Sequence, residues 1–105
     1  TMLFVSGLTA RLADGTVACL SDPAGQTRVI LSALRDILHA AGGDLDDVVR
    51  IVTYLMDINH HPAMHAVRRE FFGDQPPAST TVQVTRLFDE RQLLEIEATA
   101  IIPAR

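Results

Sequence analysis

The segment Val48–Met56 (VVRIVTYLM) constrains the fold more than any other part of this 105-residue chain. Apart from Arg50, its side chains are apolar, aromatic or β-branched at odd and even positions alike, which is typical of a strand buried on both faces. Such a strand lies inside a sheet and needs a layer of structure on each side. We therefore expect residues 48–56 to form a central strand.

Two helices are predicted, one on each side of this strand in the sequence. The first begins at Asp22-Pro23, an N-cap residue followed by proline, and ends at Gly42-Gly43. The second begins near Pro62, with His61 as N-cap, and ends at Gly73. Apolar residues recur at helical spacing in both: Ile30, Leu34, Ile37, Leu38 and Ala41 in the first, and Met64, Val67 and Phe71 in the second.

Further strands are expected on both sides of these helices. Leu3–Val5 is a short strand, and Asp14-Gly15 is a hairpin turn signal that predicts a return strand at Thr16–Cys19. Thr80–Leu87 and Leu93–Ile102 alternate at period two. The predicted order is ββαβαββ in one α+β domain, 1–105, a mixed sheet with two helices packed on one face. The chain opens directly on a strand, which leaves room for a preceding N-terminal segment.

The two helices cannot cover both faces of this sheet. A helix is roughly 10 Å wide and strands are about 4.8 Å apart, so two helices cover one face of four or five strands. The strand at 48–56 is nevertheless apolar on both faces. We therefore expect a second copy of the chain to cover the other face.

Composition excludes several classes of function. The net charge is −4 and all nine basic residues are arginines, so a lysine Schiff base with pyridoxal phosphate is excluded. Acidic charge and only five aromatic residues argue against a nucleic-acid partner. No apolar run approaches the roughly 18 residues of a membrane helix. The single cysteine, Cys19, permits no internal disulfide, is expected in the core, and favours a reducing, cytoplasmic location.

Several short motifs, in order along the chain, resemble the signature of the Rid (YjgF-like, endoribonuclease L-PSP) family. The strongest are Pro77-Ala78-Ser79 followed by an alternating strand, and then Leu94–Ala98 (LEIEA). The other matches are Val5-Ser6-Gly7, Gln26-Thr27-Arg28, Ala40-Ala41-Gly42-Gly43, Asp46-Asp47-Val48 and Phe71-Phe72. The resemblance covers essentially the whole chain.

The resemblance implies a chorismate-mutase-like fold and a homotrimer with a small-molecule ligand in each cleft between subunits. It implies hydrolysis of reactive enamines or imines, such as 2-iminobutanoate and 2-iminopropanoate, to a carbonyl compound and ammonia without a cofactor. It assigns Glu95 to activation of the attacking water, and it places Ser79, Thr81 and His65 in the cleft with backbone from Ser6 and Gly7.

Three of these positions depart from the family pattern. Ser79 stands where the family has a carboxylate-binding arginine, and a hydroxyl supplies neither the charge nor the fork of a guanidinium. Thr81 replaces a cysteine, and His65 replaces an asparagine. The departures predict altered substrate specificity, and they leave open whether Arg11, Arg28 or Arg86 restores the charge.

Simpler interpretations stand beside these. Glu95 and Glu97 also fit a solvated strand face. His60, His61 and His65 lack the spacing of a metal site, so no metal is expected. Ser79 with His65 could form a nucleophile and its base, although no third member is evident. Two functions are therefore carried forward: a cofactor-free deaminase with altered specificity, and a non-catalytic trimer that binds a small metabolite.

Overall fold

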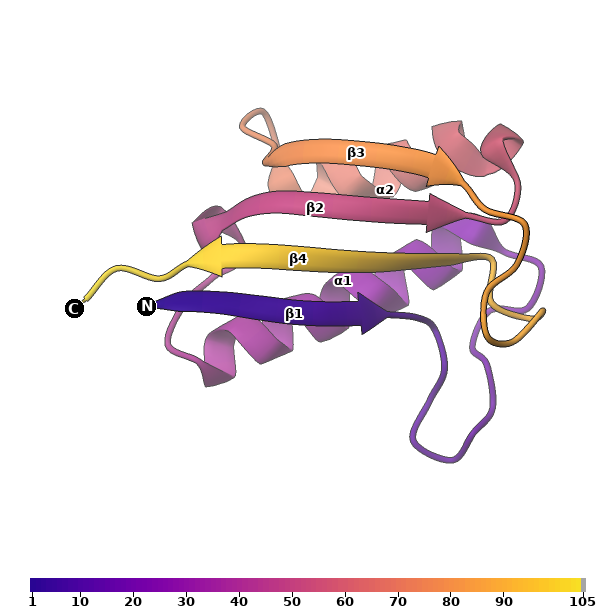
Figure 1. Ribbon diagram of the computed structural model, residues 1–105, viewed down its shortest axis with the longest axis horizontal. Helices are drawn as coiled ribbons and strands as arrows, with labels where there is room; N and C mark the ends of the chain where they lie inside the picture. Colours follow the sequence, from indigo (N-terminus) through magenta and orange to yellow (C-terminus); the bar gives the residue numbers. More distant parts are fainter. Residues whose placement is uncertain (105) are drawn as a thin grey trace.

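The structure is a computed structural model that describes residues 1–104. One mixed sheet of four strands carries two helices on a single face (Figure 1). The strands are β1 (Met2–Leu8), β2 (Val48–Leu55), β3 (Ala78–Gln83) and β4 (Leu94–Ile101). The helices are α1 (Pro23–Ala40) and α2 (His61–Phe72), and short 3-10 turns η1 (Leu45–Asp47) and η2 (Ile58–His60) precede β2 and α2.

The segment expected at the centre of the sheet does lie there. The strand order is β1-β4-β2-β3, so β2 is hydrogen-bonded on both edges. It runs antiparallel to β4 and parallel to β3. A parallel pair requires a crossover connection, and α2 supplies it between β2 and β3. The predictions of a central strand and of a mixed sheet are confirmed.

Local sequence explains where the helices begin and end. The Asp22 side chain accepts a hydrogen bond from the Gly25 amide at 3.0 Å, which caps α1, and Gly42 follows the helix with φ +85°. Helix α2 ends at Gly73, where φ is +65°. Its N-cap is His60, which makes no side-chain capping bond, so the expectation of His61 is off by one residue.

The hydrophobic core fills the space between the helices and one face of the sheet. Its most deeply buried apolar side chains are Ile30, Leu31, Leu34, Leu38, Ile51, Leu55, Met64, Val67, Leu94 and Ile96. The predicted stripe of α1 is wrong at Ile37 and Ala41, which are exposed. Leu31 is buried in addition, so the buried apolar stripe of α1 consists of Ile30, Leu31, Leu34 and Leu38.

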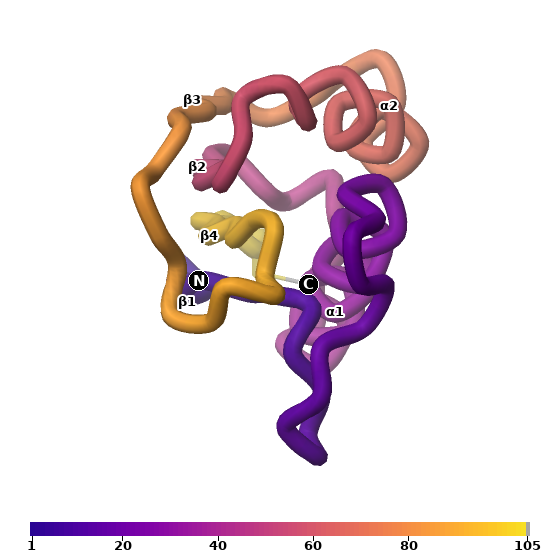
Figure 2. The backbone as a smooth tube through the Cα atoms, turned by 90° about the vertical axis from the view of Figure 1, so that its right-hand side faces the viewer, coloured from indigo at the N-terminus to yellow at the C-terminus, as the bar shows by residue number. Residues whose placement is uncertain are grey.

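No described element of the chain covers the other face of the sheet, which we call the open face. Both helices lie on the same side of the sheet (Figure 2). Among the side chains on the open face, Met2 and Phe4 of β1 are 57% and 73% exposed, and Val82 and Ile101 are also exposed.

Among residues 1–104, no helix has the length and apolar character needed to span a bilayer.

The predicted return strand at Thr16–Cys19 is wrong. The turn at Asp14-Gly15 forms, with φ +88° at Gly15, but only one bridge, between Arg11 and Val17, follows it. Cys19 and Ser21 have φ of +54° and +59°, which turns the backbone away from a strand and toward the start of α1. Cys19 is exposed and therefore not a core residue. The element order is βαβαββ.

Candidate functional site

A pocket of about 320 Å³ lies where α2, the connector after it and β3 meet. Its wall is formed by Ile51, His65, Arg68, Arg69, Gly73, Asp74, Pro76, Pro77 and Ser79. The connector contributes Pro76-Pro77, whose restricted backbone holds this part of the wall extended. Two of the predicted site residues, His65 and Ser79, therefore line one pocket.

An arginine joins these two residues. Arg68 is 8% exposed and donates hydrogen bonds to Ser79 Oγ at 2.9 Å and to His65 Nδ1 at 3.0 Å. A guanidinium is only a donor, so His65 Nδ1 must accept and the ring carries its proton on Nε2. Burial and the Arg68 charge lower the pKa of His65, which keeps the ring neutral. Because Arg68 bonds to both side chains, the structure gives no support to a Ser79–His65 nucleophile and base.

Arg68 has no carboxylate partner within the described part of the chain. The ion pairs of residues 1–104 involve Arg28, Arg91 and two histidines, and none includes Arg68. Burial lowers the pKa of Arg68, although a guanidinium remains protonated in proteins. The pocket thus contains a buried positive charge whose partners are both neutral.

The arginines considered from the sequence do not reach this pocket. Arg28 pairs with Glu70 on the surface at 3.0 Å, and Arg86 donates to the Leu87 carbonyl. Arg11 is exposed, and none of the three lines the pocket.

Sequence reasoning missed Arg68, although a signal was present. It occupies the i+4 position after Met64, inside the stripe that faces the core. A charged residue in an apolar stripe calls for an explanation, because buried arginines are rare.

Thr81 lies on the same face of β3 as Ser79 but outside the pocket wall. Ser79 pairs with Ile51 and Thr81 with Thr53, and both partners are buried on the helix side of the sheet. Thr81 makes no hydrogen bond through its side chain with the described residues. Its predicted role in the cleft stays a prediction.

Glu95 lies on the open face, against the backbone of Gly7. A Cβ atom built on Gly7 would lie 2.5 Å from both Cδ and Oε2 of Glu95, so any other residue here would displace this carboxylate from its present position. The register shift between Val5 and Leu8 places Ser6 and Gly7 in a bulge of β1. Within residues 1–104, Glu95 has no hydrogen bond or ion pair through its side chain.

Glu97 has a different environment from Glu95, although both lie on one face of β4. The Tyr54 hydroxyl donates a short hydrogen bond to the Glu97 carboxylate. This bond is the main cause of the raised pKa of Tyr54. Glu97 is thereby engaged within the sheet, whereas Glu95 is free to contact a ligand.

Within one chain, the two parts of the predicted site lie on opposite faces of the sheet. Ser79 pairs with Ile51 on the helix side, whereas Glu95 pairs with Tyr54 on the open face. We call them the pocket half (His65, Arg68 and Ser79) and the glutamate half (Glu95, Ser6 and Gly7). A single chain does not bring them together.

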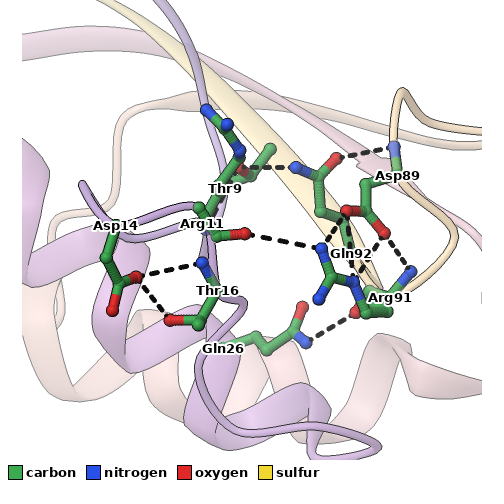
Figure 3. Close-up of polar contacts among 9 residues, drawn as sticks. Thr9, Arg11, Asp14, Thr16, Gln26, Asp89, Arg91 and Gln92 are labelled. Atoms are coloured by element: carbon green, nitrogen blue, oxygen red, sulfur yellow. Dashed lines mark hydrogen bonds and ion pairs between the residues drawn. The ribbon is translucent and has the colours of Figure 1, made fainter.

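A polar network fixes the start of β4, directly before Glu95. Gln26 of α1 is fully buried, donates to the Arg91 carbonyl at 3.0 Å and accepts from the Leu93 amide at 2.8 Å. Arg91 also forms an ion pair with Asp89 at 2.6 Å, and the network reaches the loop after β1 (Figure 3). The strand that presents Glu95 is therefore anchored to α1.

Sequence comparisons give a consistent set of relatives. The family model for "Endoribonuclease L-PSP" matches residues 1–102. A RutC family protein of Pyrococcus horikoshii is 44% identical over 75 residues, which are 71% of this chain and 59% of that protein. The match thus spans less than two thirds of that relative. The 3-aminoacrylate deaminase RutC of Acinetobacter baylyi is 35% identical over 99 residues, 94% of this chain and 78% of that protein.

Solved structures agree in fold. A member of the Rid protein family from Yersinia pestis has a TM-score of 0.85 and 31% identity, over 96% of this chain and 78% of that one. A member of the YjgF/YER057c/UK114 family from Mycobacterium tuberculosis has a TM-score of 0.84 and 34% identity, over 96% and 79%. The expected chorismate-mutase-like fold is confirmed, and the chain belongs to the endoribonuclease L-PSP family, also described as the Rid or YjgF family.

Proposed function

We propose that the protein is a cofactor-independent deaminase that hydrolyses an enamine or imine to a carbonyl compound and ammonia. The observation that carries this proposal is the Glu95 carboxylate, which is unpaired within residues 1–104 and held against Gly7. Family membership supports it, as does the relative from Acinetobacter baylyi that is named a 3-aminoacrylate deaminase.

The chemistry requires one well-placed carboxylate. Water adds to the carbon of the C=N bond while Glu95 accepts a proton from it. Glu95 then returns this proton to nitrogen, which gives a carbinolamine. It next transfers the hydroxyl proton of the carbinolamine to nitrogen, so that the C–N bond breaks and ammonia leaves as the carbonyl forms. An enamine first tautomerises to the imine. An imine and water thus give a carbonyl compound and ammonia, with no redox step and no cofactor.

The complete site is proposed to form between subunits of a homotrimer. The pocket half and the glutamate half lie on opposite faces of one sheet, so they can meet only across an interface. The open face carries exposed Met2, Phe4, Val82 and Ile101, which a second copy would bury. The ligand is then a small molecule in a cleft between two chains, and we place this assembly in the cytoplasm.

A second candidate function follows from position 79. Ser79 is a neutral hydroxyl where the family pattern has a charged guanidinium, so its side chain by itself offers no positive charge to an anion. In this alternative the trimer binds a small metabolite for regulation or storage and does not turn it over.

The rate of ammonia release separates the two candidates. Imines would be generated in situ from several amino acids by an amino-acid oxidase, including those that give 2-iminopropanoate and 2-iminobutanoate. We expect the protein to accelerate ammonia release and Glu95→Gln to lower this rate about 10²- to 10⁴-fold.

Glu97→Gln is the matched control, because an amide can still accept the Tyr54 hydrogen bond. An unchanged rate in Glu95→Gln would contradict the catalytic role. Ligand binding without any turnover by the intact protein would favour the alternative.

A further inference from the structure

Arg68 is unusual because it is buried without a counter-ion among residues 1–104. Arginine side chains are almost never fully buried unless they are paired, since desolvation of an unpaired charge costs several kcal/mol. Arg68 is 8% exposed, and within the described residues its side-chain hydrogen bonds go to a hydroxyl and a neutral imidazole. A fold that retains such a charge, in the wall of a pocket, is organised to receive an anion.

The hydrogen-bonding groups that remain free around Arg68 are donors, which also suits an anion. A guanidinium has five N–H groups, and two of these contacts leave three N–H groups available. Ser79 Oγ and His65 Nδ1 both accept from Arg68, so the Ser79 O–H and the His65 Nε2–H remain as donors. The pocket therefore offers donors and a positive charge at one place, which suits a carboxylate.

The other charged groups of the wall do not cancel this charge. Arg69 is exposed and adds a second positive charge, and Asp74 is the only acidic residue of the wall. Asp74 forms no ion pair with either arginine.

We propose that Arg68 is the carboxylate-binding residue of this protein, and that the pocket selects small ligands with a carboxylate group. Serine at position 79 then accepts a hydrogen bond that orients the Arg68 guanidinium. Arg68 would then supply, from a neighbouring helix, the positive charge that serine at position 79 lacks. The inference deepens the proposed function by naming the substrate class, but it concerns binding and does not depend on turnover.

The test is calorimetric titration of the full chain with pyruvate, compared with pyruvamide, which lacks the carboxylate. We expect pyruvate to bind at least tenfold more tightly than pyruvamide. Arg68→Met should weaken pyruvate binding about ten- to hundred-fold and leave pyruvamide binding unchanged. Arg68→Lys should recover part of the affinity, because it keeps the charge and loses the fork.

Two further arginine variants locate the effect. Arg28→Met removes the same charge from the surface, where Arg28 pairs with Glu70, and should leave pyruvate binding unchanged. Arg69→Met tests the other arginine of the wall. If it weakens binding as much as Arg68→Met does, Arg68 is not the specific receptor and the proposal fails.

A swapped pair gives the sharpest test. Ser79→Arg alone places a second guanidinium beside Arg68, so we expect weaker pyruvate binding or a lower Tm. In the double variant Arg68→Met with Ser79→Arg, the positive charge moves from position 68 to position 79, which Arg68 contacts in the intact protein. Pyruvate binding should then return to within about fivefold of that of the intact protein. A double variant as weak as Arg68→Met would overturn the proposal that the two positions share one carboxylate site.

Thermal unfolding distinguishes a ligand-binding role from a structural one. Buried charged groups can often be replaced by well-packed apolar side chains of similar volume without loss of stability, because their desolvation is costly. We therefore expect Arg68→Met to have an unchanged or higher Tm together with its loss of affinity. A clearly lower Tm with unchanged pyruvate affinity would mean that Arg68 is structural. Pyruvate binding that depends on Arg68, without any imine hydrolysis, would uphold this inference and refute the proposed deaminase.

Discussion

The two faces of the sheet are built from the same four strands but have different surroundings. On the helix face, Ile51, Leu94 and Ile96 are at most 1% exposed beneath α1 and α2. On the open face, Phe4 is 73% exposed and no described part of the chain covers it. The halves of the candidate site follow the same division, because Arg68 lies on the helix side and Glu95 on the open side. One face is thus completed by the chain itself, and the other is the face on which the proposed homotrimer would assemble.

A deletion in the core should break this comparison most strongly. We expect Ile96→Ala to lower the free energy of unfolding by about 2–5 kcal/mol, because it leaves a cavity under both helices. The loss should be independent of protein concentration, which chemical denaturation at two concentrations would measure. A loss below about 1 kcal/mol would mean that the helix face is not closed as described.

A charge on the open face should act on association instead. Under the proposed homotrimer, Phe4→Asp buries a carboxylate at the interface, and we expect association to weaken at least about 100-fold. Analytical ultracentrifugation would show the mass falling to that of one chain. Leu12→Asp is the control, because Leu12 is exposed in the loop after β1 and not on the sheet. An unchanged mass in Phe4→Asp would remove the open face from the interface.

The glutamate half depends on the space above Gly7. Gly7→Ala would place Cβ against the Glu95 carboxylate, which must move aside. That carboxylate is the end of a flexible side chain, so we expect the free energy of unfolding to change by only about 0.5 kcal/mol. The rate of imine hydrolysis should fall about tenfold or more. In a Glu95→Gln background, Gly7→Ala should have no further effect on the rate. Additive losses would show that Gly7 acts independently of Glu95.

Acid should destabilise the Asp89–Arg91 ion pair, which helps to fix the start of the strand that carries Glu95. The hydrogen bonds from Arg91 lower the pKa of Asp89 to about 2, below its usual value near 3.9. A carboxyl whose pKa is lower in the folded state stabilises the protein above pH 4, and this contribution is lost as the pH falls from about 4 to 2. Urea unfolding between pH 5 and 2 should therefore show a shallower pH dependence in Asp89→Asn than in the intact protein. The same slope in both would mean that Asp89 is not responsible, and Asp36→Asn serves as the charge-matched control.

Local pattern was sufficient for most of the fold. The doubly apolar segment 48–56 predicted the central strand, and Asp22, Gly42 and Gly73 predicted the ends of the helices. The prediction failed at 16–19, because a turn signal specifies a reversal of the chain but not the length of the pairing after it. Positive φ at Cys19 and Ser21, which depends on how the loop joins α1, ended that pairing.

The candidate site was predictable only in part. The period of a strand alone separates Glu95 and Glu97 from the core side of β4, and the structure agrees. The different roles of the two carboxylates depend on Tyr54, which is 43 positions away from Glu97 in the sequence. The sequence identified Ser79 as a position without the family arginine, but it did not identify Arg68, which contacts Ser79.

The sequence by itself determined the central strand, the two helices, the apolar character of both faces of the sheet, and the identity of the side chains available for chemistry. Only the tertiary structure decided that Arg68 of α2 reaches Ser79 of β3, and that Glu95 lies on the opposite face. The physical reason is that periodicity reports which way a side chain points from its own element, whereas a contact between elements depends on how they pack. A missing charge at one position can therefore be supplied from a neighbouring helix.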